Sequence, residues 1–171
     1  DGEGDVAFVD LFSKLAEYDF DVRKFKAADV SVPNTSYIWG DKFFHGGLMP
    51  RVSNLDDLPS PYLSGLMDQF FDEYLVPAMQ TSRGCPYSCT FCHDGADYMR
   101  KTRRFSQERI DAEIEYISAR TQVPTLLLAD LNFGIFKQDL DTAHKLAWSQ
   151  EKHGWPKSID TGVAKNHKER V

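Results

Sequence analysis

All three cysteines of this 171-residue chain fall on one short stretch. Cys85, Cys89 and Cys92 stand in the spacing C-x3-C-x2-C, and Gly84 and Pro86 flank the first of them. Three thiolates on one loop can converge on a single metal centre. Iron–sulfur clusters usually take four protein ligands, so a three-cysteine loop leaves one iron open to a substrate or a cofactor. The spacing therefore predicts an iron–sulfur centre with an open coordination position.

Zinc is the main alternative to a cluster. Cys89-x2-Cys92 is a common zinc half-site, and His93 is a possible further ligand. However, zinc sites usually take their second ligand pair from a distant segment, and the chain has no second cysteine pair. An odd cysteine count without a secretory segment argues against a structural disulfide. A zinc-binding interaction module without catalysis therefore stays open, and metal analysis would identify it.

The cysteine loop, with Phe91 directly before its third cysteine, resembles the cluster loop of the radical S-adenosylmethionine (radical SAM) superfamily. Residues 58–63 and 80–85 are similar to the run-up found in radical SAM proteins with an N-terminal cobalamin-binding domain. Residues 2–5 resemble the end of that domain. The resemblance implies that Cys85, Cys89 and Cys92 hold a [4Fe–4S] cluster. The methionine part of SAM would chelate the open iron of this cluster. Reductive cleavage of a carbon–sulfur bond of SAM would then give a 5′-deoxyadenosyl radical.

The resemblance also implies cofactor contacts outside the cysteines. The backbone near Phe91 would lie beside the adenine of SAM. Asp130, Asn132 and Gly134 occupy the place where many radical SAM proteins carry a Gly-Gly-Glu motif that contacts the amino group of SAM; that motif is missing here. The alternative is that Asp130 and Asn132 only cap their loop. Lys165 with Asn166 would contact SAM or substrate from a third loop.

The reaction implied by the resemblance is hydrogen abstraction from an unactivated carbon, with methyl transfer as the leading outcome when cobalamin is bound. The cobalt-ligating D-x-H-x-x-G motif is absent, because Phe43 stands two residues before His45. Cobalamin would therefore bind through residues upstream of this chain. A radical SAM enzyme without cobalamin, such as a methylthiotransferase acting on RNA, is the alternative within the same class. The implied partners are a small-molecule substrate and a reductant such as ferredoxin or flavodoxin.

Charge and hydropathy limit the surroundings in which the chain works. The net charge of −6 and the pI of about 5.3 argue against broad contact with nucleic acid, and we interpret the basic residues 100–104 as a solvated loop. No apolar run approaches the roughly 20 residues that span a membrane. The acidic N-terminus has no signal-peptide core. Sparse cysteines in one motif fit a reducing compartment, which predicts a cytoplasmic protein.

The elements that position these residues are predicted to be α/β. A strand from Pro77 to Ser82 leads into the cysteine loop, and a helix capped by Ser106 follows. This helix buries three isoleucines at helical spacing: Ile110, Ile114 and Ile117. Residues 125–129 form an apolar run without alternation, which is typical of a parallel strand covered on both faces, and it ends at a loop starting with Asp130. The C-terminal edge of such strands carries the chemistry of α/β folds.

A second helix is predicted to start at an N-cap, Asp139, and to end near Gly154. Its expected inward face consists of Leu140, Ala143 and Ala147, with His144 and Trp148 as further candidates. A third strand is expected at 157–161, with its loop at 162–166. The order strand, helix, strand, helix, strand fits a parallel sheet. The resemblance implies the first two to three units of a partial (β/α) radical SAM barrel.

The residues before Val76 are predicted to form smaller elements: an amphipathic helix over 8–16, a β-hairpin over 36–45 with Gly40-Asp41 at its turn, and a short helix over 62–71. The resemblance implies three regions. Residues 1–30 would end a Rossmann-like cobalamin-binding domain, 31–75 would be a mixed linker with the hairpin, and 76–171 would begin the radical SAM domain. This stretch is expected to be part of a longer protein and, alone, to be inactive or poorly stable because helix faces and strand edges lack partners.

Overall fold

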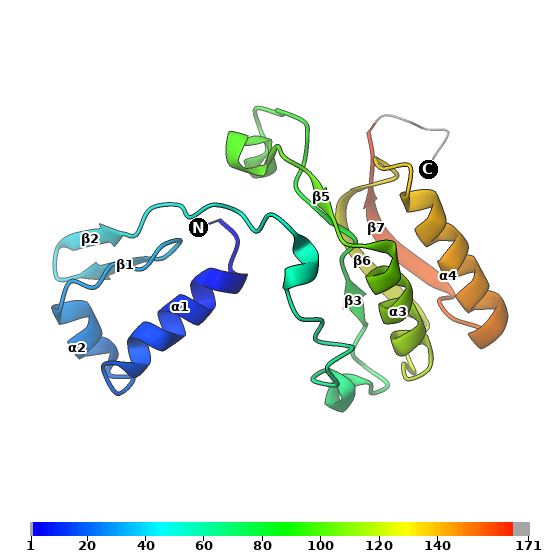
Figure 1. Cartoon of the computed structure of the whole chain (residues 1–171), viewed down its shortest axis with the longest axis horizontal. Helices are drawn as coiled ribbons and strands as arrows, with labels where there is room; N and C mark the ends of the chain where they lie inside the picture. The colour runs from blue at the N-terminus through cyan, green and yellow to red at the C-terminus, as the bar shows by residue number, and fades with distance from the viewer. Residues whose placement is uncertain (1, 166–171) are drawn as a thin grey trace. The chain divides into compact units, whose positions relative to one another are not determined.

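The computed structural model describes residues 2–165, which divide between Ser53 and Asn54 into two compact units (Figure 1). The fold is α/β, as the sequence predicts, and it contains both parallel and antiparallel strand pairs. The boundaries of the three predicted regions, and the barrel itself, stay predictions. Among the described residues, none of the helices has the length and apolar character required to cross a bilayer.

The first unit contains two helices and a hairpin, which follow one another along the chain in Figure 1. The predicted hairpin is confirmed, because Ser36 pairs with His45 and Trp39 pairs with Lys42 across the Gly40-Asp41 turn. The predicted N-terminal helix is confirmed as well. The bounds are α1 Asp5–Ala16, α2 Val22–Ala27, β1 Ser36–Trp39 and β2 Lys42–His45.

The apolar face of α1 is only partly covered among the described residues, where Ala7 is its buried side chain. Phe8 and Phe12 are exposed and contact each other, and Phe12 also packs on Phe20. In contrast, a buried ion pair closes this unit: Arg51 Nε lies 2.7 Å from Glu3 Oε1, and the Val52 N–H donates to Glu3 Oε2. The two ends of this unit are thus joined by buried polar contacts of the Glu3 carboxylate.

The second unit is built on a parallel sheet in the order β3-β6-β7, with α3 and α4 packed against each other beside it (Figure 1). A short antiparallel pair, β4 with β5, continues from β3 toward the cysteine loop. The predicted strand, helix, strand, helix, strand order is confirmed, but the first strand, predicted over 77–82, is interrupted and forms β3 and β4. The bounds are β3 Ala78–Met79, β4 Ser82–Arg83, β5 Arg103–Arg104, α3 Gln107–Ser118, β6 Thr125–Phe133, α4 Asp139–His153 and β7 Ser158–Val163.

The helix predicted over 62–71 is wrong. These residues form turns and end in a single 3-10 turn, Asp68–Phe70. Gly65 takes the left-handed conformation (φ 77°), which an α-helix cannot contain. The remaining 3-10 turns are Leu55–Asp57, His93–Gly95 and Asp97–Met99.

Helix α3 matches its prediction closely. The Ser106 hydroxyl accepts a hydrogen bond from the Arg109 N–H, so Ser106 is the N-cap. Ile110, Ile114 and Ile117 are at most 1% exposed. Because α3 is amphipathic and its apolar face is fully covered, this helix contributes much of the second unit's core.

Strand β6 differs from its prediction in two ways. It runs through Asp130 as far as Phe133, so the residues expected in a loop continue the strand. Its burial alternates: Leu126 and Leu128 are buried, while Leu127 and Leu131 are exposed. One face of β6 is therefore uncovered among the described residues, and the prediction of cover on both faces is wrong.

The predicted inward face of α4 is wrong at Leu140 and Trp148, whereas Ala143 and Ala147 line a pocket with residues of the sheet. Leu140 is exposed and Trp148 lies partly in solvent under two lysine ammonium groups. The buried side chains of α4 are Asp139, Thr142, Leu146 and Ser149. Asp139 is the first helical residue and not the N-cap, which is Gln138. The predicted end is confirmed, since Gly154 caps the helix in the left-handed conformation.

Candidate functional site: the cysteine loop

The three cysteines follow directly on β4, which ends at Arg83. All are free thiols; Cys85 is buried, Cys89 is half-buried and Cys92 is exposed. The loop therefore has one anchored end and one open end. Met79, where the parallel pairing of β3 with β6 stops, lies six residues before Cys85.

Backbone contacts fix the anchored end of the loop. The Cys85 N–H donates to the Met99 carbonyl at 2.9 Å. Gly84 has φ 103°, and a Cβ there would lie 2.7 Å from the Lys101 carbonyl oxygen and 2.8 Å from that of Met99. Only glycine permits this approach, so residues 99–101 clasp the chain just before the first cysteine. The loop also folds on itself, because the Cys92 N–H donates to the Cys89 carbonyl at 3.1 Å.

Lys165 reaches the cysteine loop from the end of β7. Its ammonium Nζ lies 3.5 Å from Cys89 Sγ and 4.9 Å from the centre of the Tyr87 ring. Desolvation lowers the pKa of Lys165, but the hydrogen bond to Cys89 and the charges of the cysteines outweigh it, so the pKa is raised. The thiolate is the form of cysteine that binds metals. The structure thus brings Lys165 and the thiols together; Asn166 lies outside the described residues.

Asp130 is buried and engaged in hydrogen bonds. Its Oδ1 accepts from the backbone N–H groups of Thr81 (2.8 Å) and Ser82 (3.1 Å). Its Oδ2 accepts from the Thr81 hydroxyl in a short hydrogen bond and from the Ser82 hydroxyl at 3.3 Å. Burial raises the pKa of the Asp130 carboxyl, and the bonds from Thr81 and Ser82 act against that rise. The carboxylate thus joins β6 to the segment that leads into Cys85.

Asn132 is the opposite case on the same face of β6. It is 3% exposed, and neither Oδ1 nor Nδ2 has a hydrogen-bond partner among the described residues. A buried amide without partners costs about 1–3 kcal/mol, so such a group is expected to meet a ligand or an ordered water. Gly134 and Phe91 are the remaining described residues that were predicted to contact SAM. The Gly134 N–H donates to Asp139 Oδ2 at 2.8 Å, and the Phe91 side chain is 90% exposed.

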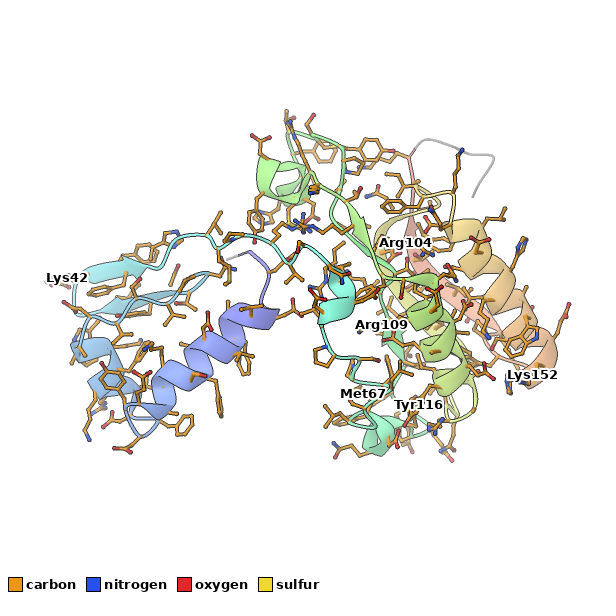
Figure 2. All side chains as sticks on the ribbon, viewed as in Figure 1. Lys42, Met67, Arg104, Arg109, Tyr116 and Lys152 are labelled. Carbon is orange, nitrogen blue, oxygen red and sulfur yellow. The ribbon has the colours of Figure 1, made fainter. Side chains whose placement is uncertain are left out.

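Sequence reasoning missed a buried network around Arg104 (Figure 2). Arg104 Nε lies 3.2 Å from Asp139 Oδ1, and its Nη2 donates to Gln107 Oε1 and Thr142 Oγ1. Asp139 also accepts from the N–H groups of Gly134 and Phe136, so it fixes the loop after β6. The interpretation of residues 100–104 as a solvated loop is therefore wrong for Arg104. Its partner lies 35 residues away, and no local pattern could have found it.

The donor set of the loop fits an iron–sulfur cluster in its chemistry, because thiolates are the usual ligands of such clusters. Three free thiols lie on one loop, and the Lys165 ammonium lies 3.5 Å from the sulfur of one of them, Cys89. Within residues 2–165, no three Cys, His, Asp or Glu side chains form a group that could hold a single metal ion. The glycine clasp and the buried Cys85 supply a fixed starting point for the three ligands.

Comparison with known proteins gives a named relative that matches nearly the whole chain. No protein-family model matches the chain. It is 37% identical, over 99% of its length, to the cobalamin-dependent radical SAM methyltransferase TokK of Streptomyces tokunonensis. The predicted resemblance to the radical SAM superfamily, and to its cobalamin-associated branch, is confirmed.

Two further relatives carry methyltransferase names. A 2-(S-pantetheinyl)-carbapenam-3-carboxylate methyltransferase from Streptantibioticus cattleyicolor is 37% identical over 99% of the chain. An uncharacterized methyltransferase from Pyrococcus horikoshii is 27% identical over 80% of the chain. The chain spans about a quarter of the length of these curated relatives, at 25%, 25% and 28%.

Proposed function

We propose that this chain supplies the cluster loop and part of the SAM site of a cobalamin-dependent radical SAM methyltransferase. The observation that carries the proposal is the 37% identity to a protein of that name, extending across nearly the whole chain and so across the cysteine loop. The methyltransferase names of the relatives favour methyl transfer over methylthio transfer. The proposed substrate is a small molecule, as is the carbapenam carboxylate in the name of the second relative.

The cysteines would each bind one iron of a [4Fe–4S] cluster, leaving the fourth iron for SAM. When bound, the cluster supplies the electron that cleaves SAM, and cobalamin held by other parts of the protein supplies the methyl group. A reductant such as ferredoxin or flavodoxin would reload the cluster. The residues of this chain would bind and orient these groups. Because Cys92 is exposed and Cys85 is buried, the open side of the loop lies toward Cys92.

Lys165 would act on the electrostatics of the cluster. Its ammonium lies 3.5 Å from Cys89 Sγ, within the range of a hydrogen bond to sulfur. Hydrogen bonds to the ligand sulfurs and nearby positive charge are among the factors that set the potential of an iron–sulfur cluster. The positive charge would stabilise the reduced cluster, which carries one more negative charge than the oxidised form.

Asn132 would bind the methionine end of SAM. Its amide oxygen can accept from the SAM ammonium group, and its amide N–H groups can donate to the SAM carboxylate. Both atoms are buried and without protein partners among the described residues, so ligand binding would satisfy groups that are otherwise desolvated. The exposed Phe91 would shield the adenine side of the site from water.

Anaerobic reconstitution of the full-length protein with iron and sulfide, followed by EPR of the reduced protein with and without SAM, tests the proposal. We expect a reduced [4Fe–4S] signal that changes when SAM is added. A protein that binds zinc tightly and takes up no sulfide would contradict the proposal and favour the zinc-binding module. A cluster signal that ignores SAM would contradict the SAM site.

A further inference from the structure

Among the described residues, the hydrogen bonds of Asp130 come from two residues that precede the cysteine loop. Thr81 and Ser82 each donate one backbone N–H and one hydroxyl to its carboxylate. Ser82 stands three positions before Cys85. Asp130 itself belongs to β6, the central strand of the parallel sheet. The Asp130 side chain therefore connects the central strand to the segment that precedes the first cysteine.

This connection replaces a strand ladder that has ended. The parallel pairing of β3 with β6 stops at Met79 and Leu128, and within residues 2–165 the next two-residue strand, β4, pairs with β5 alone. The N–H groups of Thr81 and Ser82 would otherwise have no partner on β6. In a parallel sheet, backbone carbonyls of the neighbouring strand accept such N–H groups. Here the Asp130 carboxylate accepts them instead, and it holds residues 81 and 82 against β6.

The acceptor capacity of Asp130 is also used up. An ionised carboxylate offers about four lone-pair positions, and the four donors from Thr81 and Ser82 occupy them. Asp130 is 3% exposed, so it does not face solvent. Asn132, two residues further along the same face, has both of its polar side-chain atoms unused among the described residues.

We propose that Asp130 is a positioning residue that holds the cysteine loop at the edge of the sheet, and that it leaves direct contact with SAM to Asn132. This inference rests on the proposed cluster function, because its effect is measured at the cluster. It assigns the two polar residues of β6 different tasks. Asp130 acts through Thr81 and Ser82 on the placement of Cys85, whereas Asn132 is free to meet a ligand.

The test compares three variants in the full-length protein: Asp130→Ala, Asp130→Asn and Thr81→Val. After anaerobic reconstitution, bound iron and sulfide, the EPR spectrum of the reduced cluster and the affinity of the loaded fraction for SAM are measured. We expect Asp130→Ala to lower cluster content at least threefold and to broaden the EPR signal. Asp130→Asn keeps the Oδ1 acceptor and should restore much of the content. SAM affinity of the loaded fraction should change less than threefold in every variant.

A double variant and a control separate positioning from general stability. Thr81→Val removes one donor to Asp130, so combining it with Asp130→Asn should lower cluster content by less than the product of the two single effects. Glu113→Gln weakens a buried ion pair with Arg109 on α3 and should lower the melting temperature while the EPR spectrum stays that of the wild type. If Asp130→Ala fails to fold, Asp130→Asn and Thr81→Val still give the comparison.

The outcomes distinguish this inference from the proposed function. A wild-type protein that takes up no cluster contradicts the proposed function. A wild-type protein that loads normally, with Asp130 variants that load equally well and give the same EPR spectrum, contradicts the positioning role alone. Normal loading of Asp130→Asn with SAM affinity lowered tenfold or more would make Asp130 a direct SAM ligand and would overturn the inference.

Discussion

The two halves of β6 differ in what they bury on one face of the strand. The first half buries Leu126 and Leu128, and the second half buries Asp130 and Asn132. All four side chains are at most 3% exposed, yet two are apolar and two are polar. Apolar burial stabilises a fold, whereas polar burial costs free energy unless every group finds a partner. We infer that the first half of the strand stabilises the fold, whereas the second half contributes polar groups to the candidate site.

The buried ion pair beside the second half of β6 should give the largest effect on stability. Arg104→Ala leaves Asp139 buried without its cation, and we expect the free energy of unfolding to fall by about 4 kcal/mol. Urea unfolding followed by circular dichroism measures this. The matched control is Arg100→Ala, whose ion pair with Asp97 is exposed and should matter little. Equal losses in the two variants would contradict the importance of the network.

The apolar side of the comparison is tested at α3. Ile114 is 0% exposed, and Ile114→Ala should lower the free energy of unfolding by about 3 kcal/mol through lost burial and the cavity left behind. Leu131→Ala removes an exposed apolar side chain from the other face of β6 and should have a much smaller effect. An equal loss in the free energy of unfolding for both variants would contradict the exposure of Leu131, because only a buried side chain should cost that much.

In the polar half of β6, Asn132 is expected to lower the stability of the protein and to raise its affinity for SAM. Asn132→Leu removes a buried amide without partners, and we expect unfolding without SAM to cost about 1 kcal/mol more than in the wild type. The same variant should bind SAM at least tenfold more weakly, which isothermal titration of the reconstituted protein measures. Ser149→Ala is the control, because it removes a different buried polar group without a partner among the described residues, a hydroxyl on α4. Its SAM affinity should not change.

The smallest expected effect is at Lys165. Lys165→Met removes the ammonium group beside Cys89 and should make the cluster harder to reduce, with a ratio of reduced to oxidised cluster about threefold lower at a fixed potential. EPR-monitored redox titration measures the ratio. Lys165→Arg keeps the charge and should stay close to the wild type. A potential that is unchanged in Lys165→Met would show that this ammonium group does not act on the cluster.

The apolar patterns of the second unit were predictable from sequence, but its polar contacts were not. Three isoleucines at helical spacing after a serine cap predict α3 and its inward face. The inward face of α4 contains Thr142 and Ser149, and hydropathy does not distinguish buried hydroxyls from exposed ones. The conformation of Gly65 is equally invisible in a stretch whose apolar spacing is helical.

The candidate site shows the same division. The cysteine spacing and the polar residues of the second strand are local patterns, so the sequence names Cys85, Asp130 and Asn132 directly. What Asp130 does depends on donors 48 and 49 residues earlier in the chain, and only the folded sheet brings them together. Lys165 stands 76 residues after Cys89, and its contact follows from the parallel order of the strands.

The glycine clasp before the first cysteine sets a limit on how this protein can vary. At position 84 any Cβ would meet the carbonyls of Met99 and Lys101, so the collision is with main chain, which substitutions at 99 or 101 cannot remove. No second-site change of side chain can therefore compensate for the loss of Gly84. By contrast, a Cβ at position 154 would meet no atom within 4 Å, and asparagine is a tolerable replacement there. A saturation library would separate these two glycines, although both have positive φ angles.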